Sequence, residues 1–218
     1  RPGDAERPER TQGAIDAYDG AVAYLDDALG QLFAELERRK LLANTLVIIT
    51  SDHGEEFGEH GIFDHGNSLY RQSLQVPLVI RLDTRIPAGS VVDEAVSLRD
   101  IPATITDLTG LGAGITFPGQ SLAERVFDPT RPADTIFAMV RKAIRQPESY
   151  PAAQGDLSSV AVDSLRLIRN FGSGREELFD FLRDPRESSD LLQSPRGQGG
   201  APGLRAALPS PPSPQARP

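Results

Sequence analysis

Residues 45–66 read TLVIITSDHGEEFGEHGIFDHG, a strand-like run followed by a glycine-rich segment. Residues 45–50 are β-branched or apolar without interruption, which predicts a strand buried on both faces. The glycine-rich segment contains every histidine of the chain, namely His53, His60 and His65. The histidines therefore follow directly after the end of a buried strand.

The residues before this strand predict a helix. Apolar side chains recur every three or four positions from Ile15 to Leu36, a spacing typical of one long amphipathic helix that begins near Gln12. A helix that leads directly into such a strand indicates a parallel α/β sheet. Open α/β sheets bind ligands beyond the carboxyl ends of their strands, which is where the histidine segment would lie.

The predicted fold class is α/β: part of a mixed, mainly parallel sheet flanked by helices, followed by a small antiparallel C-terminal subdomain. Short strand-like segments between residues 158 and 181 alternate with turn residues, which favours the antiparallel part. The tail is rich in Pro, Gly, Ser and Ala, a composition that cannot offset the entropy of ordering. We expect a flexible lead-in at 1–11, the α/β part at 12–145, the antiparallel part with a closing helix at 146–193, and a disordered tail at 194–218.

Composition limits the possible classes of function. The formal net charge is -8, which disfavours nucleic acid as a partner. The chain has no cysteine, hence no disulfide and no cysteine nucleophile of its own. It also lacks an apolar run of transmembrane length. It starts RPGDAERPER, without Met or an apolar signal core, so we expect a piece of a longer protein and assign no compartment.

Asp52 and His53 are the first candidate site residues. An aspartate followed by a histidine offers an oxygen and a nitrogen ligand to a divalent cation. Gly54 allows the backbone to turn sharply, and further glycines let His65 return to the same place. Two ligands do not complete a coordination shell. An acidic, solvated surface loop is the alternative interpretation.

Residues 51–81, SDHGEEFGEHGIFDHGNSLYRQSLQVPLVIR, resemble the second metal-binding signature of the sulfatases, in the alkaline phosphatase superfamily. The flanking segments resemble the same family in its own order. AYDGAVAYLDDALGQLFAEL is similar to the preceding helix, VSLRDIPATITDLTGL to the following segment, and LRLIRNFGSGREELFDFLRDPRESSDLL to the closing strands and ending. The resemblance covers residues 14–192 and implies an alkaline-phosphatase-like fold.

The resemblance also implies a chemistry. Sulfatases hydrolyse sulfate monoesters with a formylglycine nucleophile and a divalent cation that neutralises the sulfuryl oxygens. By resemblance, Asp52 and His53 are metal ligands. His65 stands where the family often has a sulfate-contacting lysine, which makes it the catalytic and substrate-binding candidate, and His60 has a supporting role. The implied metal is Ca²⁺, with Mn²⁺ or Zn²⁺ as alternatives because a histidine nitrogen favours borderline transition ions. The implied substrate is a small-molecule or carbohydrate sulfate ester.

Two parts of the family pattern have no match in these residues. The first metal-binding Asp-Asp pair of the family and its C/S-x-P-S/A-R nucleophile motif are not matched. The resemblance therefore implies the C-terminal half of a sulfatase, with the formylglycine in the N-terminal half, and we expect this chain to be inactive by itself. The alternatives are a phosphonate or phosphate ester hydrolase of the same superfamily and a non-catalytic remnant or binding module.

Overall fold

The computed structural model describes residues 8–111, 114–128 and 134–211. These residues form two compact units, which we describe one at a time. One unit contains residues 8–51 and 77–128, and the other contains residues 52–76 and 134–211. Among the described residues, no helix has both the length and the apolar character needed to cross a membrane.

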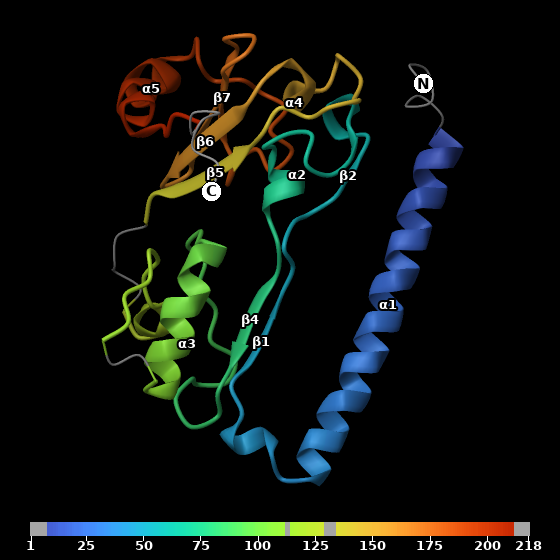
Figure 1. The fold of residues 1–218 in the computed structure, drawn as a ribbon, viewed down its shortest axis with the longest axis vertical. Helices are drawn as coiled ribbons and strands as arrows, with labels where there is room; N and C mark the ends of the chain where they lie inside the picture. Colours follow the sequence, from blue (N-terminus) through green and yellow to red (C-terminus); the bar gives the residue numbers. More distant parts are fainter. Residues whose placement is uncertain (1–7, 112–113, 129–133, 212–218) are drawn as a thin grey trace. The chain divides into compact units, whose positions relative to one another are not determined.

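The first unit begins with the long helix α1, Pro8–Arg38 (Figure 1). It confirms the predicted amphipathic helix, although it starts at Pro8 rather than near Gln12. The apolar side of α1 is largely exposed: Val22 and Leu25 keep 51% and 57% of their surface accessible. The local sequence pattern therefore accounts for this helix better than packing within the unit does.

Strands β1, Val47–Thr50, and β4, Leu78–Arg81, form an antiparallel pair in which Ile48 faces Ile80 (Figure 1). This corrects the predicted mainly parallel sheet, because every strand pair among the described residues is antiparallel. The apolar run of β1 predicted two covered faces, yet Val47–Ile49 are only half-buried and Thr50 is exposed. The prediction of a parallel sheet failed because an apolar run does not specify the direction of the neighbouring strand.

Helix α3, Ile101–Thr109, follows the short 3₁₀ helix η4, Leu98–Asp100. Ser97 caps this start: its hydroxyl accepts the Arg99 N–H, and the Asp100 carboxylate accepts the Ser97 N–H at 3.0 Å. Two further 3₁₀ helices complete the unit, η2 at Leu42–Asn44 and η5 at Ala123–Val126.

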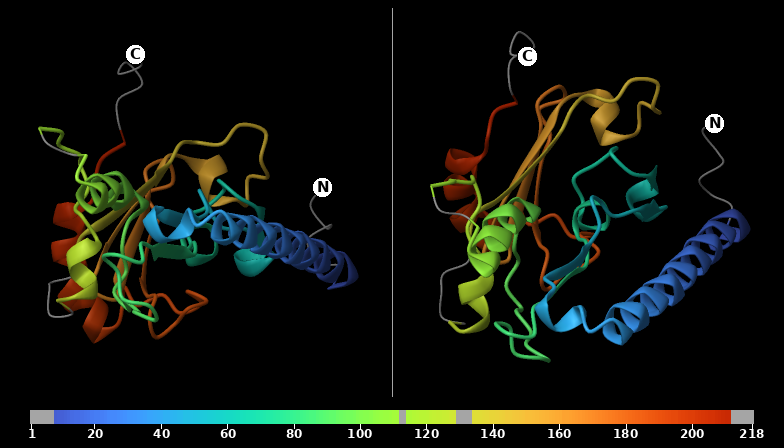
Figure 2. Two further views of the ribbon diagram at one scale, coloured as in Figure 1. Left: turned by 90° about the horizontal axis from the view of Figure 1, so that it is seen from below. Right: turned by 60° about the horizontal axis from the view of Figure 1, so that its bottom comes forward.

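The second unit is built on a four-stranded antiparallel sheet with the order β5-β6-β7-β8 (Figures 1 and 2). Its strands are β5, Ile136–Val140; β6, Leu157–Val162; β7, Leu165–Asn170; and β8, Glu176–Asp180. The predicted C-terminal antiparallel strands are therefore present, and β5 adds a strand at the edge of the same sheet.

Both faces of this sheet are covered. Alternate residues of the strands point to opposite faces, so neighbours such as Leu178 and Phe179 join different clusters. One cluster packs under helix α5, Pro195–Ala207, and comprises Val160, Leu167, Leu178, Ala201 and Leu204. The other cluster packs under the histidine segment and comprises Ile62, Leu69, Tyr70, Ala152, Leu157, Ile168 and Phe179. The sheet therefore packs against the segment that contains the histidines.

The segment over the second face is short and irregular. It contains β2, Glu56–Phe57, paired antiparallel with β3, Phe63–Asp64, and the 3₁₀ helix η3, Glu59–Gly61, between them. The single-turn helix α2, Arg71–Leu74, follows. Another single turn, α4 at Pro151–Gln154, packs against β7.

Helix α5 corrects the predicted disordered tail for residues 195–207. Ser194 caps it by accepting the Gly197 N–H at 3.0 Å, and Pro195 occupies the first turn, where its missing N–H costs nothing. Ala201 and Leu204 are buried against the sheet. Composition suggested disorder because the benefit of this burial depends on a sheet far away in sequence. Residues 1–7 and 212–218 lie outside the described residues.

Candidate metal centre

The candidate site begins at Gly54, where the backbone is held tightly against α2. The Gly54 N–H donates to the Ser73 carbonyl oxygen at 2.9 Å. A Cβ atom on Gly54 would lie 1.9 Å from the Gln72 carbonyl oxygen, so only glycine fits here without a shift of the backbone. The contact fixes the positions of His53 and Glu55, the two neighbours of Gly54.

Asp52 and His53 present two ligand atoms side by side. Asp52 Oδ2 lies 3.7 Å from His53 Nε2. His53 Nδ1 lies 2.9 Å from the Gly54 carbonyl oxygen, which selects the tautomer that carries its proton on Nδ1 and its lone pair on Nε2. One ion with ligand distances of about 2.0–2.2 Å can bridge these two atoms. The donor chemistry and spacing of this pair therefore fit the predicted metal ligands.

His65 lies against His53, as the sequence predicted that it could. The two imidazole rings are stacked, with centroids 3.9 Å apart and planes 23° from parallel. His65 Nδ1 lies 3.1 Å from a carboxylate oxygen of Glu55. Glu55 orients the ring by this contact and leaves Nε2 for another partner. Sequence reasoning missed Glu55, although its position two residues after His53 was a usable signal.

A tight hairpin returns His65 to this place. Glu56 pairs with Asp64, and Phe57 pairs with Phe63. Asp64 has a φ of 65° and Gly66 a φ of 73°, so left-handed backbone flanks His65 on both sides. This turn brings the imidazole of His65 back beside the residues that follow β1 in the sequence.

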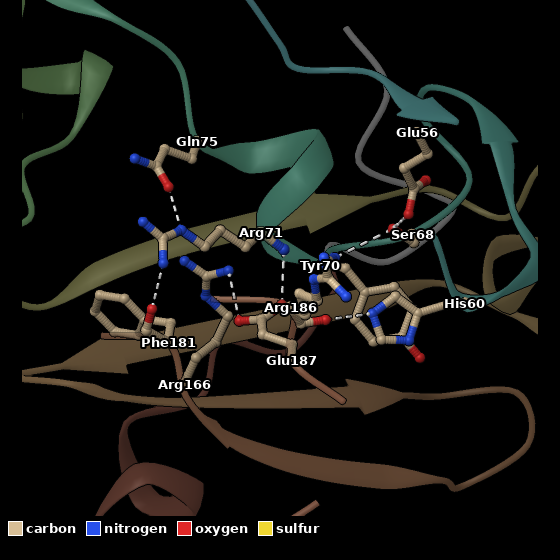
Figure 3. Close-up of polar contacts among 10 residues, drawn as sticks. All are labelled: Glu56, His60, Ser68, Tyr70, Arg71, Gln75, Arg166, Phe181, Arg186 and Glu187. Carbon is tan, nitrogen blue, oxygen red and sulfur yellow. Dashed lines mark hydrogen bonds and ion pairs between the residues drawn. The ribbon is translucent and has the colours of Figure 1, made fainter. Parts of the chain in front are cut away.

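His60 is turned toward the sheet instead (Figure 3). Its ring stacks on Tyr70 with centroids 3.7 Å apart and planes 11° from parallel. His60 Nε2 donates to the Arg186 carbonyl oxygen at 3.0 Å, which ties the loop to the turn after β8. His60 therefore does not join the His53–His65 pair, and its contacts are those of a structural anchor.

Glu187 anchors the end of the same segment (Figure 3). Its carboxylate is 1% exposed and accepts the Arg71 N–H at 2.7 Å and a guanidinium N–H of Arg166 at 3.0 Å. A guanidinium N–H of Arg71 donates to the Phe181 carbonyl oxygen at 2.5 Å. Removing a partner from such a buried pair leaves an uncompensated charge, so these contacts hold α2 firmly to the sheet.

Glu56 is a second buried carboxyl group next to the site. Its side chain is 1% exposed, and one oxygen accepts the Ser68 hydroxyl proton at 2.9 Å. Burial raises the pKa of Glu56 to about 7, and the negative charges of Glu59 and Glu55 add to this effect. The group therefore changes its charge near neutral pH although it faces the interior.

Two family models match the chain. The family described as "Sulfatase" matches residues 2–111, and the family described as "N-sulphoglucosamine sulphohydrolase, C-terminal" matches residues 58–208. The matched ranges overlap at residues 58–111, which include His65, whereas Asp52, His53 and Glu55 lie in the first range only. Together they include both structural units.

One curated relative is similar to the chain in sequence, and two solved structures are similar to it in fold. The choline-sulfatase of Rhizobium meliloti is 30% identical over 87% of this chain and 35% of its own length. A structure of a protein bound to its substrate, D-glucosamine-2-N,6-O-disulfate, superposes with a TM-score of 0.77 at 24% identity, over 95% of this chain and 42% of that one. The phosphonate monoester hydrolase of Agrobacterium radiobacter superposes with a TM-score of 0.68 at 25% identity, over 87% of this chain and 40% of that one.

The chain therefore spans less than half the length of the relatives that it matches. The family models, the fold and the ordered motifs around Asp52 and His53 agree with one another. The chain belongs to the sulfatase family of hydrolases, in the alkaline phosphatase superfamily.

Proposed function

We propose that the protein hydrolyses sulfate monoesters with a divalent metal ion, and that this chain contributes one part of the active site. The observation that carries the proposal is the 3.7 Å separation of Asp52 Oδ2 and His53 Nε2, with His65 stacked on His53. Asp52 and His53 lie in the range that the sulfatase family model matches, and His65 lies where both family models overlap. The substrate class is a small-molecule or carbohydrate sulfate ester.

Asp52 and His53 are the residues that hold the metal. Ca²⁺ is the preferred ion, and the histidine nitrogen also admits Mn²⁺ or Zn²⁺. When bound, the ion supplies charge neutralisation for the sulfuryl oxygens. The remaining ligands and the formylglycine nucleophile come from protein outside these 218 residues.

His65 is the substrate-facing residue of the chain. Glu55 engages its Nδ1 atom, so Nε2 is the atom that can meet a sulfate oxygen or the leaving-group oxygen. A protonated imidazole in that position donates a hydrogen bond to the anion or a proton to the departing alcohol. His60 supports the loop from the sheet and has no part in the chemistry.

The test is hydrolysis of 4-nitrophenyl sulfate by the product of the complete reading frame. Asp52→Asn and His53→Ala should each lower the metal-dependent rate by at least about a hundredfold, since they remove metal ligands. Glu59→Gln, an exposed carboxylate change in the same loop, should leave it unchanged. Equal activity of all four proteins would contradict the metal site. Measurable hydrolysis by the 218-residue chain alone would contradict its predicted inactivity.

A second candidate is phosphonate or phosphate ester hydrolysis. The similarity to the phosphonate monoester hydrolase favours it, because that fold match is as extensive as those to many sulfatases. The ratio of rates on 4-nitrophenyl sulfate and 4-nitrophenyl phenylphosphonate separates the two reactions. A complete gene product that binds metal but cleaves neither ester would instead indicate a non-catalytic remnant.

A further inference from the structure

Three donor atoms from two parts of the histidine loop converge. One ligand atom each from His53, Glu55 and His65 lies within 4.8 Å of the other two. Zinc holds nitrogen and oxygen ligands at about 2.0–2.2 Å in a tetrahedral arrangement, so two ligand atoms of one ion lie about 3.4 Å apart. Small side-chain rotations therefore suffice to bring all three atoms around one ion.

The chemistry of this set differs from that of the Asp52–His53 pair. Two imidazoles and one carboxylate form a borderline donor set that suits Zn²⁺, whereas Ca²⁺ requires mostly oxygen ligands. Asp52 is not a member of this group of three, although it lies beside His53, and 88% of its side chain is exposed. The loop thus offers two ligand sets that share only His53.

The cluster is held in place by its scaffold. Gly54 is fixed against α2, which positions His53 and Glu55 on either side of it. Glu55 already contacts His65 at 3.1 Å. The stacked rings must turn about their Cβ–Cγ bonds to share an ion, and both have room, because 42% and 50% of the His53 and His65 side chains are exposed. Because the backbone is already fixed, only these side-chain rotations lose entropy on binding.

We propose that His53, Glu55 and His65 together bind one Zn²⁺ ion, as an alternative to metal binding by Asp52 and His53. Because His53 is common to both sets, the two modes exclude each other. Zinc also takes His65 away from any substrate. The proposal of zinc binding does not depend on the proposed hydrolase function. Only the expected inhibition of hydrolysis, which follows because zinc occupies His53 and His65, rests on that function.

The test is calorimetric titration of ZnCl₂ into the purified 218-residue chain at fixed pH. The chain should bind one zinc ion, and Glu55→Gln and His65→Gln should each weaken binding by at least about tenfold. Glu59→Gln and Asp64→Asn are matched controls in the same loop, with folding checked by circular dichroism, and should change the dissociation constant by less than about threefold. Asp52→Asn should behave like the controls for Zn²⁺.

X-ray absorption at the zinc edge tests the proposal on the unmodified chain. It should show two imidazole ligands, and a single imidazole would overturn the proposal. Equal zinc affinity of Glu55→Gln, His65→Gln and the controls would also overturn it, as would loss of zinc binding in Asp52→Asn alone. Failure of the hydrolase proposal has a different outcome, namely no effect of Asp52→Asn on Mn²⁺ binding or ester hydrolysis in the complete protein.

Discussion

The imidazole rings of His53 and His65 lie face to face, 3.9 Å apart between centroids. One ring follows β1 in the sequence and the other follows β3, so the stack closes the loop between them. Glu55 contacts His65 and completes the cluster. The position of each histidine therefore depends on the hairpin and on the sheet beneath it.

The hydrogen bonds of two histidines predict opposite neutral tautomers. His53 Nδ1 lies 2.9 Å from the Gly54 carbonyl oxygen, and His60 Nε2 lies 3.0 Å from the Arg186 carbonyl oxygen. Each of these nitrogens must carry the proton, because a carbonyl only accepts. Long-range ¹H–¹⁵N correlation spectra of the neutral rings should show Nδ1–H for His53 and Nε2–H for His60. The same tautomer at both positions would contradict the loop geometry.

Gly54→Ala should destabilise the protein by about 2–3 kcal/mol, because the new Cβ meets the Gln72 carbonyl oxygen at 1.9 Å and the backbone must move. Gly20→Ala is the control, since its Cβ on helix α1 meets no atom within 4 Å. That change should stabilise the protein by about 0.5–1 kcal/mol, because alanine favours a helix interior. Urea unfolding measures both. A neutral effect of Gly54→Ala would show that the loop is not held against α2.

The raised pKa of Glu56 predicts that the free energy of unfolding depends on pH. Its pKa is raised from 4.5 to about 7 in the folded protein, so the folded state binds the proton more tightly than the unfolded state does. The stabilising contribution is fully present below about pH 4.5 and is lost as the pH rises to about 7. The loss is about 3 kcal/mol at most, because a tenfold difference in proton affinity between the folded and unfolded states corresponds to about 1.4 kcal/mol.

Glu56→Gln should remove this contribution, because an amide does not ionise. Urea unfolding at pH 5 and pH 7.5 should therefore show a smaller decline in stability for Glu56→Gln than for the wild type. Glu37→Gln, an exposed carboxylate change on helix α1, is the control and should retain the decline. Parallel behaviour of wild type and Glu56→Gln across this range would be inconsistent with a buried, protonated Glu56.

Tyr70→Phe should lower the free energy of unfolding by about 1–2 kcal/mol. The Tyr70 hydroxyl is buried and donates to the Glu177 carboxylate at 3.0 Å, and phenylalanine leaves that acceptor with one donor fewer. Tyr24→Phe, on an exposed ring of α1, should change stability by less than about 0.5 kcal/mol. Equal effects of the two substitutions would argue against the buried hydrogen bond.

Leu204→Ala tests whether α5 belongs to the folded unit. Leu204 is 5% exposed and packs against the sheet, so its truncation should cost about 2–4 kcal/mol. Leu182→Ala is the control, because Leu182 is 56% exposed. Thermal unfolding measures both. A stable Leu204→Ala variant would favour the disordered tail that composition suggested.

Patterns of neighbouring residues correctly predicted the elements that depend on interactions between residues close in sequence. The spacing of apolar residues gave helix α1 correctly, and the turn-separated segments after residue 158 gave the antiparallel strands. These features depend on residues a few positions apart, so the sequence contains the information needed to recognise them.

Contacts between distant residues decided the rest. The pairing of β1 with β4, the burial of Leu204 under the sheet, and the contact of Glu55 with His65 join segments whose approach no local period encodes. The stack of the His60 ring on Tyr70 is another contact that no local period encodes. The sequence by itself determined the family, the helix and the choice of Asp52 and His53 as candidate ligands, because these reside in residue type and spacing. Only the tertiary structure decided which ligands meet, because a tight hairpin over a buried sheet sets the distances between them.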